Sequence, residues 1–298
     1  MPVATRSSKV RKTRKSTSVR AIGTKALRPS PAKGKRNVSS ATKVKSTSLN
    51  QTIPVESDYN STTGGAPSLH ELLSTNEFAL SISPGFFRYY CYIGILHAME
   101  DMKCLNPTHV SGASAGALVG GFLASGMSPL AMKNLILGIR REHMWDMPGF
   151  GGVIRGSLFQ SLLEKHLPCK KIEDCPLRFG ATAFNVLQMR TKLLHQGCLA
   201  TAIRASCTFP FLFQPVWIDS QPHIDGGVFD DAGMMALPAL PPSNLLVNIV
   251  CGTERTLSSV LPPQFKHATL LTIVIDNVPL VTPFSMAEMG PVAYSYVQ

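Results

Sequence analysis

Residues 108–121 place a serine among small residues at a spacing that suits nucleophilic chemistry. A run containing Val110 ends in Gly112-Ala113-Ser114-Ala115-Gly116 and passes directly into a stretch of small apolar residues. This is the strand, turn and helix context of a nucleophile elbow, in which flanking glycines let a strained serine sit between strand and helix. The positive end of the helix would stabilise a developing oxyanion. We predict that Ser114 is a nucleophile; the alternative is a packing turn with an idle serine.

Strands and helices alternate around this serine in the predicted order of elements. A strand that is followed by a helix and a parallel strand buries its side chains under helices, and ligands then bind at the carboxyl ends of the strands. Gly85 and Ser114 both fall at such ends. The pattern predicts an α/β fold with a mainly parallel sheet in residues 68–298. The expected helices are a short one after the capping box at residues 68–71, a small-residue one after Ser114, and 89–102, 129–141, 157–167 and 199–206. The expected strands are the run from Thr108 that leads to Ser114, and 78–83, 179–185, 191–195, 245–250 and 270–275.

Positive charge is concentrated at the N-terminus. The 298-residue chain has a formal net charge of +11, and residues 1–55 alone carry 14 lysine or arginine side chains and no acid. The rest of the chain holds 15 basic and 18 acidic side chains, a net charge of −3. Binding to an anionic surface through net charge is therefore expected of the tail and not of the folded body.

Residues 1–67 are rich in Ser, Thr, Lys, Pro and Gly. They contain too few apolar side chains to offset the entropy cost of ordering, so we expect a disordered basic tail or a targeting segment. Four interpretations stay open: a cleaved mitochondrial or plastid presequence, a nuclear or nucleic-acid-binding arm, a polybasic patch for anionic lipid, and a tail that is only solvated.

Seven scattered cysteines form no C-x-x-C pair, and no apolar signal peptide opens the sequence. This pattern predicts reduced thiols in an intracellular protein, in an organelle or in the cytoplasm. The longest uncharged run, residues 104–132, contains Asn106 and Pro107, so we expect a buried strand and helix there and no transmembrane helix. The histidines show no ligand spacing with cysteine or acid, so neither a metal nor a cofactor is expected.

Three segments in this order resemble the patatin-like phospholipases. They are residues 85–96, Gly112–Gly116 and Asp225-Gly226-Gly227. Residues 202–213 are similar to the segment that precedes the Asp-Gly-Gly of this family. The resemblance covers roughly residues 76–235, and the joint occurrence of the motifs is more specific than any one of them. It implies a three-layer α/β/α patatin-like fold, with residues 68–298 as an acyl hydrolase domain.

The resemblance implies a Ser-Asp dyad without histidine. Ser114 would be the nucleophile, and Asp225 would be the general base that takes its proton and returns it to the leaving alcohol. Gly226 and Gly227 would let the backbone approach closely enough. The nearby carboxylates Asp230 and Asp231 are expected to be solvated or capping residues.

The glycine-rich oxyanion loop of the family aligns on residues 84–89. Pro84, Phe86 and Tyr89 stand where glycine is usual, and proline has no N–H group to donate to an oxyanion. A weakened enzyme is therefore one interpretation, because phenylalanine resists backbone angles that glycine permits. The expected oxyanion and binding residues are Gly85, Phe86, Phe87, Arg88 and Ala115.

The resemblance also implies the substrate class, a fatty-acyl ester of a glycerolipid such as a phospholipid, lysophospholipid, galactolipid or neutral glyceride. We expect the protein to work at a peripheral membrane or lipid-droplet surface. Residues 1–55 could contact an anionic surface, and no specific nucleic acid is expected as a partner.

Three other interpretations remain. The first is an α/β-hydrolase esterase with a triad of Ser114, Asp225 and His267, although such a fold normally supplies several strands before its elbow. The second is a catalytically weak lipid-binding scaffold. The third is a nucleic-acid-binding protein that carries a vestigial hydrolase.

Overall fold

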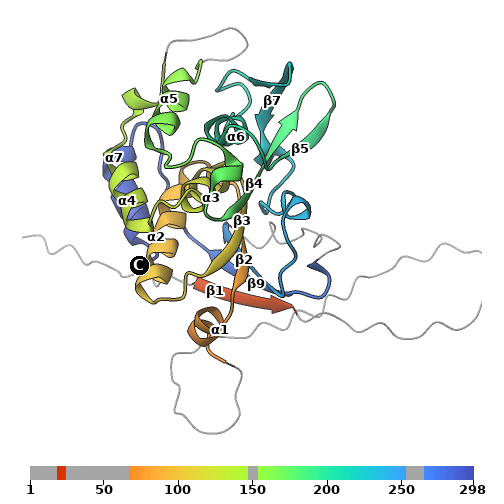
Figure 1. Ribbon diagram of the computed structural model, residues 1–298. Helices are drawn as coiled ribbons and strands as arrows, with labels where there is room; N and C mark the ends of the chain where they lie inside the picture. Colours follow the sequence, from red (N-terminus) through yellow and green to blue (C-terminus); the bar gives the residue numbers. More distant parts are fainter. Residues whose placement is uncertain (1–18, 25–66, 147–153, 253–264) are drawn as a thin grey trace, which may run out of the picture.

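Nine strands form one sheet in the computed structural model (Figure 1), which describes residues 19–24, 67–146, 154–252 and 265–298. Along the sheet the order is β1-β9-β8-β2-β3-β4-β7-β6, and β5 pairs with β4. The five strands from β9 to β4 are parallel, and the strands on either side of them are antiparallel. Their bounds are β1 Val19–Thr24, β2 Phe78–Ile82, β3 Pro107–Ala113, β4 Arg178–Asn185, β5 Arg190–Leu194, β6 Val216–Ile218, β7 Gln221–Asp225, β8 Leu245–Cys251 and β9 Thr269–Ile275.

Strand β2 lies at the centre of the sheet, between β3 and β8, and all five of its residues are buried. A strand that is covered on both faces needs apolar or hydrogen-bonded side chains on both. Leu80 and Ile82 face the helices, whereas Ala79 joins a second apolar cluster on the opposite face. Ser81 also lies buried, and its hydroxyl donates to the carbonyl of Ala232 at 3.0 Å.

The α-helices pack over one face of the sheet, where α2, α4 and α7 lie side by side (Figure 1). Residues 230–240, including the 3-10 helix η5 (Leu237–Ala239), cover the opposite face among the described residues. In the described part of the chain, the second layer consists of turns and this short helix. The helices are α1 Leu69–Thr75, α2 Tyr89–Asp101, α3 Ala115–Ala124, α4 Pro129–Gly138, α5 Ser157–His166, α6 Leu199–Ser206 and α7 Met286–Ser295.

The α/β class with a mainly parallel central sheet is confirmed. Helix α1 begins with the predicted capping box of Ser68 and Glu71. Strand β1 lies inside the segment for which composition predicts disorder, and it pairs with β9. The rest of residues 1–66 lies outside the described residues.

Helix α3 crosses β2 at the closest approach that backbone atoms permit. A Cβ atom on Gly116 would lie 2.0 Å from the carbonyl oxygen of Ile82. Glycine is therefore required at this position, because a strand carbonyl inside the sheet cannot swing aside.

We predict that Gly116→Ala lowers the free energy of unfolding by about 3 kcal/mol, as overpacking of a fixed backbone does. Gly138→Ala is the matched control, because no atom lies within 4 Å of a Cβ atom built there. Since alanine is the better helix former, the control should raise stability by up to about 1 kcal/mol. Denaturant unfolding of both variants measures the difference, and equal stabilities would contradict the close approach.

Candidate active site

Ser114 occupies a sharp turn between strand β3 and helix α3. Its backbone has φ 51° and ψ −119°, a conformation that residues with a Cβ rarely adopt. The glycines on either side make room for this turn, since a Cβ atom on Gly112 would lie 2.5 Å from the backbone of Gly116. The turn therefore holds the serine hydroxyl beyond the end of its strand, where a neighbouring element can reach it.

Asp225, the last residue of β7, provides the partner for this serine. The Ser114 hydroxyl donates a hydrogen bond to Asp225 Oδ2 at 2.7 Å. Both side chains are nearly removed from water, with 8% of Ser114 and 4% of Asp225 exposed. The structure thus brings together two residues that lie 111 positions apart in the sequence.

The carboxylate of Asp225 is held on its other side by the turn that follows it. Asp225 Oδ1 accepts a hydrogen bond from the Gly227 N–H group at 2.7 Å, and the Asp225 N–H group donates to the carbonyl of Thr208 at 2.8 Å. Gly226 is required by close packing, because a Cβ atom there would lie 2.1 Å from the carbonyl oxygen of Thr182. The two glycines thus fix the direction of the carboxylate.

Burial raises the pKa of the Asp225 carboxyl to about 6, although the hydrogen bonds from Ser114 and Gly227 oppose this shift. The carboxylate is therefore ionised at neutral pH but is a stronger base than a solvated aspartate. Such a pKa suits a group that must accept a proton near pH 7.

Two residues at the end of helix α6 also contact Ser114, and sequence reasoning gave neither a role. The Ser114 N–H group donates to Ser206 Oγ at 2.9 Å, and Cys207 Sγ donates to the carbonyl oxygen of Ser114 at 3.1 Å. Burial raises the pKa of the Cys207 thiol well above its usual range, so the thiol stays protonated. The sequence did offer one signal for this contact. Within the family-like segment 202–213, the polar Ser206 stands at the end of an otherwise largely apolar helix.

The loop that aligns with the family's glycine-rich segment has a glycine-like conformation at Phe86, where the family usually has glycine. Phe86 has φ 52°, in the left-handed region where a phenylalanine is rare. Two hydrogen bonds hold the loop in place, one from helix α2 and one from the loop itself. The Tyr92 hydroxyl donates to the carbonyl of Pro84 at 3.1 Å, and Arg88 Nη1 donates to the carbonyl of Cys251 at 2.6 Å.

Two cavities open from the serine. One, of about 450 Å³, is lined by the loop at residues 84–88, by Ser114 and Asp225, and by residues 278–281. The other, of about 60 Å³, is lined mainly by apolar side chains and also touches Ser114 and Asp225. The expected binding residues divide between them. Gly85 and Arg88 line the larger cavity, Ala115 lines the smaller, and Phe86 and Phe87 line both.

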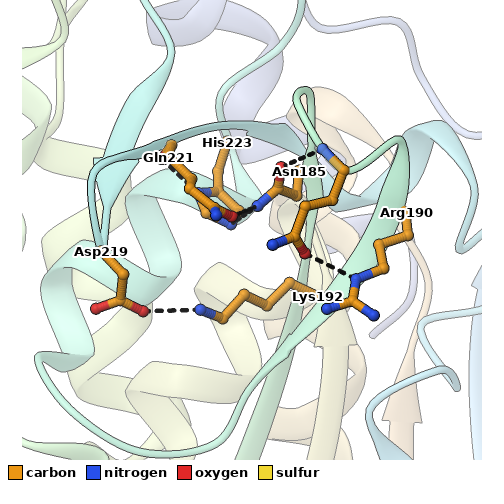
Figure 2. Close-up of polar contacts among 7 residues, drawn as sticks. Asn185, Arg190, Lys192, Asp219, Gln221 and His223 are labelled. Carbon is orange, nitrogen blue, oxygen red and sulfur yellow. Dashed lines mark hydrogen bonds and ion pairs between the residues drawn. The ribbon is translucent and has the colours of Figure 1, made fainter.

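A polar network supports strand β7 two residues before Asp225 (Figure 2). The buried side chain of His223 lies 3.3 Å from Asn185 on β4, measured from Nε2 to Nδ2. Asn185 also donates to the side chain of Gln221. Burial lowers the pKa of His223, so the ring is neutral at pH 7. The network joins the β4–β5 and β6–β7 hairpins and so fixes the strand that carries the carboxylate.

Of the two roles expected for Asp230, solvated or capping, the structure rules out the first and agrees with the second. It is buried, and it accepts hydrogen bonds from Thr182 Oγ1 at 3.0 Å and from the Met234 N–H group at 2.9 Å. It therefore organises the turns that cover the second face of the sheet, whereas Asp231 is exposed.

His267 lies exposed just before β9, at the amino-terminal edge of the sheet. Ser114 and Asp225 lie at the opposite edge, which is the length of a seven-residue strand away, about 20 Å. The structure therefore does not form the triad that was considered as an alternative.

Within the described ranges, no three His, Cys, Asp or Glu side chains are grouped so that they could hold a metal ion. In the same part of the chain, each helix is too short or too polar to cross a membrane.

Fold and site together define an α/β protein with a buried serine-aspartate pair at the carboxyl edge of its parallel strands. The family model for the patatin-like phospholipases matches residues 80–238, more than half of the chain. The chain therefore belongs to the patatin-like phospholipase family.

Several known proteins are similar to parts of the chain. An uncharacterised NTE family protein of Mycobacterium tuberculosis is 27% identical over 164 residues, which are 54% of this chain and 45% of that protein. Lysophospholipase NTE1 of Yarrowia lipolytica is 25% identical over 178 residues, 57% of this chain and 12% of that protein. The chain thus spans less than half the length of these curated relatives.

Two solved structures are similar at low sequence identity. VipD from Legionella pneumophila matches with a TM-score of 0.45 and 18% identity, over 59% of this chain and 50% of that one. ExoU in its complex with SpcU, from Pseudomonas aeruginosa, matches with a TM-score of 0.38 and 18% identity, over 74% of this chain and 49% of that one.

We predict that Asp225→Asn stabilises the protein at pH 8 by on the order of 2 kcal/mol, because it removes a desolvated charge and keeps the shape of the side chain. The folded pKa is raised above the unfolded value, so the folded state binds the extra proton between about pH 4 and 6. The advantage of the variant should therefore shrink as the pH falls through this window.

Denaturant unfolding at pH 8, 6 and 4 checks this prediction. Asp219→Asn is the control, since Lys192 lowers the pKa of that exposed carboxyl and its removal should not stabilise the protein. A variant at Asp225 that is less stable than the wild type at pH 8 would contradict the desolvation argument.

Proposed function

We propose that this protein is a serine lipid acyl hydrolase that cleaves fatty-acyl esters of glycerolipids through a dyad of Ser114 and Asp225. The observation that carries the proposal is the 2.7 Å hydrogen bond from the Ser114 hydroxyl to Asp225 Oδ2 at a strained strand-to-helix turn. Membership of the patatin-like phospholipase family supports the same reaction class.

In the proposed reaction, Asp225 Oδ2 accepts the hydroxyl proton as Ser114 Oγ attacks the ester carbonyl. The tetrahedral intermediate collapses to an acyl-serine, and the protonated Asp225 returns the proton to the leaving alcohol oxygen. A water molecule then attacks the acyl-serine with Asp225 again as the base, which releases the fatty acid and restores the serine.

Backbone N–H groups are the proposed stabilisers of the oxyanion. Phe86 and Phe87 open the short helix η1 (Phe86–Arg88), so their N–H groups have no acceptor within that helix. Gly85 and Ala115 contribute N–H groups from the walls of the two cavities, and the dipole of α3 points its positive end at Ser114. We propose that Phe86, because its backbone is left-handed, takes the position that glycine has in the oxyanion loop of the family.

The shape of the site supports an acyl substrate. The smaller cavity is lined by Phe87, Leu118, Phe159 and other apolar side chains, which suits a hydrocarbon chain, while the larger and more open cavity can admit a polar head group. The name of one relative, a lysophospholipase, agrees with such a substrate. We propose a glycerolipid ester whose acyl chain begins beside the apolar side chains of the smaller cavity, with the rest of the lipid in the larger one.

The proposed setting is a peripheral lipid surface inside the cell, in an organelle or in the cytoplasm. All seven cysteines are free thiols, which agrees with a reducing compartment. In this proposal residues 68–298 form the acyl hydrolase domain, and the 14 basic side chains of residues 1–55 contact anionic head groups.

We predict that Ser114→Ala and Asp225→Asn each lower ester hydrolysis at least about a thousandfold, since each removes one member of a pair that acts as a unit. Release of fatty acid from phosphatidylcholine and of p-nitrophenol from a short-chain ester measures the loss. A fluorophosphonate should label the wild-type protein and leave Ser114→Ala unlabelled.

Ser125→Ala and Asp219→Asn are matched controls, because Ser125 lies at the far end of α3 and Asp219 in the exposed β6–β7 turn. Both should keep activity within about twofold, as surface and remote changes usually do. Full activity in Asp225→Asn would refute the dyad. A wild type that neither turns over nor takes the label would favour a lipid-binding scaffold instead.

We also predict a pH dependence that follows Asp225. The carboxyl must be ionised to accept the proton, so kcat/KM should rise about tenfold per pH unit below its pKa of about 6 and then reach a plateau. A pH profile with a water-soluble ester checks this. A rise centred near pH 7 or above would point to a histidine and contradict the proposed base.

A further inference from the structure

Exposed apolar side chains ring the opening of the larger cavity. They come from four separate segments that follow β2, α6, β7 and β9, all at the edge of the sheet where Ser114 lies. Phe211, Leu280 and Phe284 are 91%, 79% and 78% exposed. A monomeric protein exposes single apolar residues routinely, but a cluster around one opening marks an interaction site. The rim consists of Phe86, Phe209, Val228 and Leu280, which line the larger cavity, together with the exposed Phe211 and Phe284 two and four residues further along the same segments.

One member of the rim holds a backbone conformation that its own packing does not explain. Phe211 has φ 64°, in the left-handed region that favours glycine or asparagine. The Phe211 side chain gains little from the folded chain because it stands in solvent. Its placement is therefore unfavourable for the isolated protein, and a contact with something outside the chain would offset this.

The outer rim continues into the apolar interior of the site. Phe86 lines both cavities and contacts the ring of Phe209, with centroids 5.6 Å apart. On the other side, Phe284 lies edge-on to Trp145, which lines the smaller cavity, with centroids 6.3 Å apart. An apolar path therefore leads from the exposed surface to the serine.

A basic side chain lies beside this path. The guanidinium of Arg141 stands 4.9 Å from the ring centre of Phe284. An arginine stacked on an exposed aromatic ring can keep its charge at the level of lipid head groups while the ring enters the apolar layer.

We propose that the rim is the surface by which this protein docks on a lipid aggregate, so that an acyl ester passes from the aggregate through the larger cavity to Ser114 without crossing water. This inference rests on the proposed function, since it assigns the lipid surface to the same site. A lipid surface fits better than a protein partner, because a protein seated on the rim would close the opening. A bilayer that covers the rim delivers substrate into it.

The test uses the full chain and vesicles of phosphatidylcholine, a neutral lipid, at 0.5 M salt, so that the basic tail contributes little. Binding is measured by co-sedimentation in the Ser114→Ala background, which leaves the lipid intact. Phe211→Ser combined with Phe284→Ser should lower the partition coefficient at least about tenfold, because two large apolar side chains no longer enter the lipid. Neither residue lines either of the two cavities that touch Ser114.

The matched control is Leu69→Ser with Met102→Ser, two exposed apolar side chains at the opposite edge of the sheet. It should partition as the parent does. With Ser114 restored, the rim variant should hydrolyse p-nitrophenyl butyrate, a water-soluble ester, within about twofold of the wild-type rate and lose activity only on vesicles.

Equal partitioning of the rim variant and the control would overturn the docking proposal even if the ester is hydrolysed. If the rim variant partitions less than the control but the wild type cleaves no ester, the docking proposal is supported and the proposed function is refuted. If analytical ultracentrifugation shows that the rim variant abolishes self-association of the wild type while vesicle binding is unchanged, the surface belongs to a second copy of the chain and the proposal fails.

Discussion

The hydrogen bond between the Ser114 hydroxyl and Asp225 Oδ2 is the contact on which the arrangement of this protein depends. It joins the ends of β3 and β7, which lie on either side of β4. To bring the two side chains this close, helix α3 presses on the carbonyl of Ile82 and the turn after Asp225 presses on that of Thr182. Only glycine fits at these two positions, Gly116 and Gly226. The glycines of both motifs are therefore explained by the close packing around this one hydrogen bond.

The same contact requires a buried carboxylate, which lowers the free energy of unfolding. Asp225 and Asp230 are both buried carboxylates whose pKa values burial raises to about 6. Asp230 is surrounded by donors and organises a turn, whereas Asp225 faces a serine and a cavity. A buried charge with few donors destabilises the folded state and is retained where its basicity is used. The same burial thus serves structure at Asp230 and, in the proposed mechanism, chemistry at Asp225.

Local signals in the sequence predict much of this structure. The capping box of α1, the apolar run of β2 and the Gly-x-Ser-x-Gly turn depend on neighbouring residues, and each was placed correctly. The pairing of Ser114 with Asp225 was predicted from the resemblance. Long-range features were not predictable: the burial of Asp230, the contact of Ser206 with Ser114, and strand β1, whose pairing depends on β9 some 250 residues away. Such features depend on contacts that no local pattern encodes.

The position of β2 has a consequence for the order in which the chain can assemble. Residues 80–238 contain Ser114, Asp225 and the loop at residues 84–89, yet β2 pairs on one side with β8, where Leu80 lies opposite Val247. While the chain is being synthesised, β2 therefore leaves the ribosome long before β8 exists, and the unpaired N–H and C=O groups of that edge stay open to other strands. The nascent protein must pass through a stage in which Ser114 and Asp225 have been made, while β8, β9 and the cavity residues 278–281 have not.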